Sequence, residues 1–135
     1  MLSAIAIIPS PPLMVPELAT GAASGLVDLR EAVFAAAAAL PDRWVAIGAG
    51  PCDEVVGTRA VGTFAGYGAD VRVTFAPGVF GTAARLPLCA LIAGWVRAQV
   101  NPFARAEVRS HGDGHGADAA LARGRSLREI GRAHV

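Results

Sequence analysis

The chain has 135 residues, of which 53% are hydrophobic and 17% charged, so it can form one globular domain with a real core and is too short for two. Its 12 basic and 11 acidic residues give a formal net charge of +1. This balance excludes the strongly basic surface that binds nucleic acids or anionic membranes. The apolar segments Ile5–Ile8 and Leu86–Val96 are too short to cross a bilayer.

Residues 2–18 predict a strand followed by a stiff loop. The apolar run Ile5–Ile8 is typical of a buried strand, and it stops at Pro9. Four prolines between Pro9 and Pro16 hold the backbone in extended or turn conformations. Two interpretations stay open: the loop is the wall of a ligand site beyond the carboxyl end of a sheet, or the prolines only terminate an edge strand.

The rest of the chain alternates between helices and strands. The predicted order is a helix over Ala22–Leu40, a strand over Trp44–Ile47, an ordered loop over Val55–Gly68, a strand over Val71–Phe75, a helix over Pro87–Val96, a strand over Ala104–Ser110 and a last helix from Ala119. This order predicts an α/β fold with a mostly parallel sheet flanked by helices. The last helix, of barely two turns, predicts that the fold is incomplete at the carboxyl end.

The final residues are predicted not to be native sequence. Residues 1–128 are assigned to one domain, whereas residues 129–135, Glu-Ile-Gly-Arg-Ala-His-Val, neither complete an amphipathic pattern nor end in a cap. Residues 130–135 can also be back-translated into the start of a widely used sequencing adapter. An ordinary frayed tail is the alternative, and it stays open.

The residues that follow the second predicted strand are candidates for chemistry. Cys52, Asp53 and Glu54 place a thiol and two carboxylates where they can bind a metal or polarise a substrate, and Cys52 is a nucleophile if a base lies near. The simpler alternative is that a carboxylate caps the next turn and that Cys52 is buried as a small hydrophobe. Just before them, Gly48 and Gly50 form only a fragment of a dinucleotide-binding motif.

Two further observations concern metals and the redox environment. His111, Asp113 and His115 alternate with glycines, and a solvated turn is favoured over a metal site because ordering such a loop is costly. Cys52 and Cys89 are isolated in sequence and show no metal-type spacing. They predict a reduced, cytoplasmic setting.

Four segments together resemble the amino-terminal part of the class III extradiol ring-cleavage dioxygenase superfamily of B-like subunits, and most closely its uncharacterised actinobacterial branch. The segments are Pro9–Leu18, Val45–Pro51, Gly62–Val71 and Leu86–Trp95. The resemblance covers roughly residues 1–128. It implies that this chain is the amino-terminal part of one such domain.

The resemblance also implies that the catalytic metal of this superfamily is missing. Its catalytic members hold Fe(II) with two histidines and one glutamate. Where they place histidines after the first and second strands, this chain has Ser10 and Gly50-Pro51-Cys52, and serine is a poor ligand for Fe(II). The glutamate ligand and the acid–base histidine belong to the carboxyl half of the family domain. We therefore expect no metal and no other cofactor in this chain.

The function that the resemblance implies is that of a binding or scaffold domain, which keeps the cleft of the family and lacks its iron. We expect this cleft to be lined by Ser10, Pro11, Pro12, Cys52, Asp53, Glu54 and Tyr67. The partner would be a small molecule or a protein, with no nucleic acid and no membrane. Missing strands would leave an exposed sheet edge, which favours pairing with a partner, including a homo-oligomer.

Two other functions stay open at this point. One is a metal-dependent oxidoreductase, of the aromatic ring-cleaving dioxygenase kind, or a hydrolase, using Cys52, Asp53 or Glu54 with residues from a missing carboxyl half. The other is a fragment with no independent function.

Overall fold

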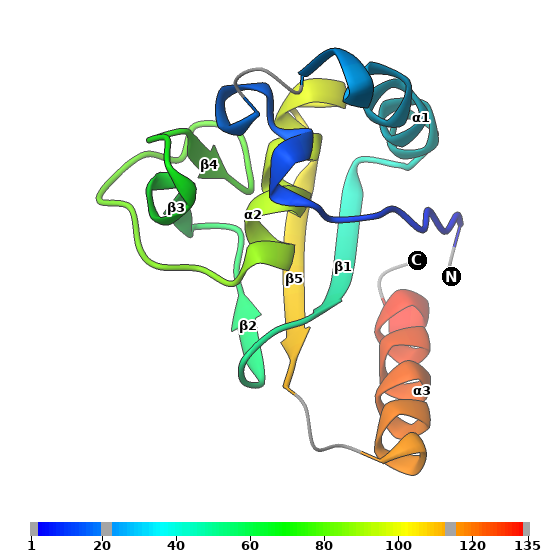
Figure 1. Ribbon diagram of the computed structural model, residues 1–135. Coiled ribbons are helices and arrows are strands. Elements are labelled where there is room, and N and C mark those ends of the chain that lie inside the picture. The colour runs from blue at the N-terminus through cyan, green and yellow to red at the C-terminus, as the bar shows by residue number, and fades with distance from the viewer. Residues whose placement is uncertain (1–2, 20–22, 113–115, 134–135) are drawn as a thin grey trace.

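The computed structural model describes residues 3–19, 23–112 and 116–133 (Figure 1). Within these ranges a three-stranded sheet and a two-stranded sheet pack with helices. The elements are α1 (Val27–Ala38), β1 (Arg43–Ala49), β2 (Glu54–Val56), β3 (Val61–Thr63), β4 (Arg72–Thr74), α2 (Leu88–Val100), β5 (Arg105–His111) and α3 (Ala117–Ala133), with short 3-10 turns η1 (Pro12–Met14), η2 (Pro16–Leu18), η3 (Ala23–Leu26) and η4 (Ala65–Tyr67).

The fold is a small α+β fold, so the predicted α/β fold with a mostly parallel sheet is wrong. The larger sheet has the order β1-β5-β2, in which β1 is parallel to β5 and β2 is antiparallel to it. Strands β3 and β4 form a separate antiparallel pair. The link from β1 to β2 explains the difference, because residues 50–53 are too few for the crossover that a parallel connection requires. The predicted loop over Val55–Gly68 contains part of β2, all of β3 and η4.

The predicted buried strand at Ile5–Ile8 does not form. These residues have no strand partner in either sheet, and Ile7 is 93% exposed. The chain is instead anchored just after the prolines, where Met14 and Val15 are fully buried between η1 and η2. The Nε of Arg30 in α1 donates a hydrogen bond to the carbonyl of Met14 at 2.8 Å. Burial of this proline-rich turn therefore replaces the expected strand.

Helix α2 forms the centre of the core, as its apolar spacing predicts. It packs against β1 and β5 on one side and β4 on another, and its Trp95 ring lies 5.5 Å from the ring of Phe34 in α1. Gly48 in β1 faces Cys89 of α2 so closely that a Cβ there would overlap the cysteine side chain. Gly48 thus serves helix–sheet packing, and this accounts for part of the glycine motif noted in the sequence.

The larger sheet has one buried face and one open face. Trp44, Ala106 and Val108 point into the core, and their neighbours along the strands point the other way. We define the open face by Arg43, Val45 and Ile47 of β1, Val55 of β2, and Arg105, Glu107, Arg109 and His111 of β5. Val45, Ile47 and Val55 are all exposed there. Figure 1 shows α1 and α2 together at one part of the sheet, whereas α3 stands apart beside β1.

Arg97 of α2 is a buried cation that the sequence analysis missed. It is 2% exposed and donates hydrogen bonds to the carbonyl and the hydroxyl of Thr74 and to the carbonyls of Pro102 and Ala104. Burial lowers the pKa of the Arg97 guanidinium. The acceptors offset this desolvation, and they tie α2 to β4 and to the turn that leads into β5.

The last helix is longer than predicted. It runs over Ala117–Ala133, so the proposed boundary at residue 128 lies inside a continuous helix. Asp113 and His115 of the predicted polar loop lie outside the described residues. None of the described helices combines the length and the apolar character needed to span a membrane.

Candidate functional site

Two of the residues predicted for chemistry, Asp53 and Glu54, lie in a small cavity between the larger sheet and α3. We call this cavity of about 230 Å³ the α3 pocket. It lies where β5 ends and β2 begins, and α3 closes one side. Its lining consists of Asp53, Glu54, Val55, Arg109, Ser110, His111, Arg123 and Ser126.

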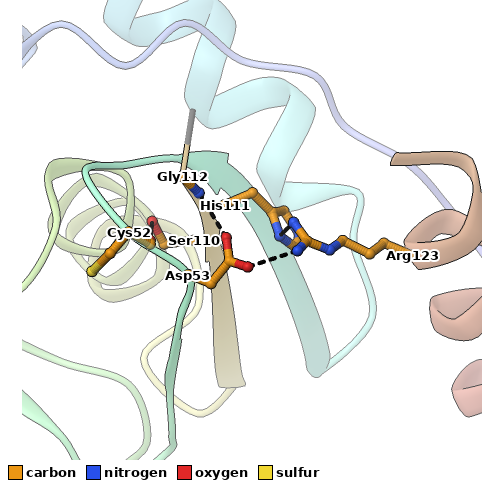
Figure 2. Close-up of polar contacts among 6 residues, drawn as sticks. All are labelled: Cys52, Asp53, Ser110, His111, Gly112 and Arg123. Atoms are coloured by element: carbon orange, nitrogen blue, oxygen red, sulfur yellow. Dashed lines mark hydrogen bonds and ion pairs between the residues drawn. The ribbon is translucent and has the colours of Figure 1, made fainter. Parts of the chain in front are cut away.

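Asp53 is the centre of the polar contacts in the α3 pocket. One carboxylate oxygen, Oδ1, accepts a hydrogen bond from the backbone N–H of Gly112 at 2.8 Å. The other, Oδ2, lies 2.6 Å from Nη2 of Arg123 in an ion pair (Figure 2). Asp53 therefore joins the end of β5 to α3, which resembles the capping role that the simpler interpretation assigned to it.

His111 contacts the same arginine. Nη1 of Arg123 lies 2.7 Å from Nδ1 of His111. A guanidinium only donates hydrogen bonds, so Nδ1 of His111 accepts here, and the ring is then neutral with its proton on Nε2. Nearby, Nε of Arg109 pairs with the carboxylate of Glu107 at 3.1 Å. Both arginines of the pocket thus have described carboxylate partners.

The remaining predicted site residues do not join the α3 pocket. Cys52 is exposed, and Figure 2 shows its side chain directed away from Arg123. Its carbonyl accepts a hydrogen bond of 3.4 Å from Ser110 Oγ. Tyr67 lies in η4, between β3 and β4, where it contacts Phe64 edge to face.

The proline-rich loop is also separate from this pocket. Ser10 and Pro11 directly precede η1, which Pro12 begins. In Figure 1 this turn lies near the amino-terminal part of α1, whereas the connection from β1 to β2 lies at the opposite end of the sheet. Neither described cavity is lined by Ser10, Pro11, Pro12, Cys52 or Tyr67. The structure therefore does not bring the two predicted loops together into one cleft.

The α3 pocket contains residues that the sequence analysis did not select. Arg109, Arg123 and Ser126 had no local signal, and Arg123 meets Asp53 across 70 positions of sequence. An arginine on a predicted helix reads as a solvated side chain unless its partner is known. His111 was noted only as part of a flexible polar loop.

The donor set of the α3 pocket favours polar contacts over metal coordination. Among the described residues no group of three His, Cys, Asp or Glu side chains is placed to hold a metal ion. Both oxygens of Asp53 are engaged by N–H donors, and Nδ1 of His111 faces a guanidinium. The arrangement positions α3 against the sheet, and it suits hydrogen bonding to polar groups.

No protein-family model matches the chain, no curated protein matches it, and no solved structure matches it. The resemblance to the superfamily of B-like dioxygenase subunits thus stays a prediction from the motifs.

Proposed function

We propose that the chain is a binding or scaffold domain that contacts its partner through the open face of the larger sheet. The observation that carries this proposal is the exposure of Val45, Ile47 and Val55 on a face whose opposite side is fully packed. Apolar side chains gathered on one face of a sheet favour contact with another surface. Strand β1 is also the sheet edge, and its outer side has no described strand partner.

We also infer that the domain has no ferrous centre and derives from the superfamily of B-like dioxygenase subunits. The residues that stand in place of histidines, Ser10 and Cys52, are offered by loops at different ends of the sheet. A two-histidine, one-carboxylate site needs three ligands that converge on one point. The position of these loops supports the inference from the residue types.

An enzyme that uses Cys52, Asp53 or Glu54 is less well supported. Asp53 already accepts hydrogen bonds at both oxygens, so its carboxylate is committed to structure. The thiol of Cys52 points away from His111, the described imidazole nearest in sequence (Figure 2). A cytoplasmic location stays part of the proposal, and the two free cysteines, Cys52 and Cys89, agree with it.

The binding role is tested by sedimentation velocity of the full chain over a range of concentrations. We expect self-association through the open face, which the double variant Val45→Thr, Ile47→Thr abolishes. Val27→Thr is the matched control because Val27, at 40% exposure, is as accessible as Val45 but lies on α1. A monomer at all concentrations, or equal association in all three proteins, would contradict the proposal.

The absence of a ferrous centre needs a separate experiment. The full chain is titrated anaerobically with Fe(II) in a calorimeter, and oxygen uptake is then measured with catechol. We expect neither stoichiometric binding nor turnover. One bound iron per chain with catechol cleavage would refute this part of the proposal.

A further inference from the structure

The amino-terminal ends of β1 and β5 carry two arginines that face each other. Arg43 and Arg105 are direct partners in the parallel register, both on the open face, and both side chains are exposed. Neither forms an ion pair or a side-chain hydrogen bond with any described residue. Like charges at directly opposite positions destabilise a sheet, so the pair has no structural benefit in the described chain.

The two carboxylates beside this pair are engaged elsewhere. Glu107 forms its ion pair with Arg109, at 3.1 Å. Oδ1 of Asp42 accepts a hydrogen bond of 2.8 Å from the side-chain amide of Asn101. Because the Glu107 charge is balanced by Arg109, Arg43 and Arg105 outweigh Asp42 and leave this end of the sheet positive.

An exposed aromatic ring stands next to the arginines on a rigid turn. Phe103 is 79% exposed, and its backbone N–H donates to Oδ1 of Asn101 at 3.2 Å. On either side of it, the carbonyls of Pro102 and Ala104 accept hydrogen bonds from the buried Arg97, at 2.6 and 2.9 Å. The backbone of Phe103 is thus fixed before any ligand arrives, which lowers the entropy lost on binding.

These groups share a cavity of about 470 Å³, which we call the arginine pocket. Its lining consists of Asp42, Arg43, Trp44, Val45, Thr58, Phe103, Arg105 and Glu107. The volume lies within the range of about 300–1,000 Å³ typical of small-molecule sites, unlike that of the α3 pocket. Polar and apolar groups therefore meet in a space of suitable size.

We propose that the arginine pocket binds a small organic anion. A carboxylate or phosphate group would lie between the guanidiniums of Arg43 and Arg105, whose planar N–H forks match both anions. The apolar or aromatic body of the ligand would pack on Phe103 and Val45. This inference rests on the proposed binding function and names the class of ligand for one end of the open face.

The test is calorimetric titration of the full chain with phenyl phosphate, inorganic phosphate and phenol. Phenyl phosphate combines both halves of the proposed ligand, so we expect it to bind at least tenfold more tightly than either half. Arg43→Gln and Arg105→Gln should each weaken phenyl phosphate about tenfold. Arg85→Gln is the matched control, because Arg85 is exposed and lies outside the pocket.

A second variant separates the apolar contact from the charge. Phe103→Ala should lower the affinity for phenyl phosphate to that for inorganic phosphate and leave the latter unchanged. Because Phe103 is exposed, its loss should not unfold the protein, and the urea midpoint checks this. Equal affinity for phenyl phosphate and inorganic phosphate in the wild-type chain would overturn the inference.

The two proposals fail in different ways. If phenyl phosphate does not bind but Val45→Thr, Ile47→Thr still abolishes self-association, the ligand class is refuted and the binding domain stands. If phenyl phosphate binds and Arg85→Gln weakens it as much as Arg43→Gln does, the arginine pocket is refuted as its site. Loss of both self-association and anion binding from the wild-type chain would refute both.

Discussion

The two ends of the open face treat their charges differently. At the carboxyl end of β5, Arg123 pairs with Asp53 and contacts His111, and Arg109 pairs with Glu107. At the amino end, Arg43 and Arg105 lie opposite each other, and neither has a described partner. Charges that satisfy one another fasten elements of the fold together, whereas charges left facing each other remain ready for a ligand. The comparison assigns the α3 pocket to structure and the arginine pocket to binding.

The largest expected effect is at the support of the amino end. Arg97→Met should lower the free energy of unfolding by about 3 kcal/mol, because it leaves the buried carbonyls of Thr74, Pro102 and Ala104 without their donor. Urea unfolding measures this loss, with Arg85→Gln as the control for removal of an arginine. A loss below about 1 kcal/mol would mean that Arg97 does not hold the turn that presents Phe103.

Close packing at the carboxyl end gives the second effect. A Cβ on Gly50 would overlap Ser110 Oγ, so Gly50→Ala should destabilise the chain by about 2 kcal/mol. Gly57→Ala is the matched control, because nothing lies near a Cβ at that position. Adding Ser110→Ala to Gly50→Ala should recover most of the loss in urea unfolding. Without this recovery, Ser110 is not the residue that requires Gly50.

The ion pair of the α3 pocket should contribute less. Asp53→Asn removes the charge that holds Arg123, but the pair is partly solvent-exposed, so the expected loss is about 0.5 kcal/mol. Hydrogen exchange is the sharper measurement, since amides of α3 should exchange faster while those of α2 stay unchanged. Unchanged exchange in α3 would show that Asp53 does not fasten this helix.

The smallest expected effect has the opposite sign. Arg43→Gln should stabilise the chain by about 0.3 kcal/mol, because it removes a like charge opposite Arg105. The gain should shrink as sodium chloride is added, since salt screens exposed charges. Thermal unfolding at low and high salt measures both, with Arg85→Gln as the control. Destabilisation by Arg43→Gln at low salt would mean that the pair has a structural role after all.

Much of the local structure could be predicted from the sequence. The apolar spacing of α2, the alternation in β4 and the short apolar run of β1 predicted these elements within a few residues of their bounds. Asp53 and Glu54 were selected because polar residues at a strand end are often exposed to a cavity, and both line the α3 pocket. The strand at Ile5–Ile8 failed because an apolar run specifies burial or pairing only when a neighbour is present to supply it.

Residue order alone determined which segments coil, which extend and which carry charge, because side-chain periodicity and proline chemistry act over a few residues. Only the tertiary structure decided that β5 lies between β1 and β2. That order sets Arg43 against Arg105 and brings Arg123 to Asp53 across 70 positions. Such meetings depend on strand order and register, which are fixed by packing of the whole core. For this reason the arginine pocket left no mark in the sequence.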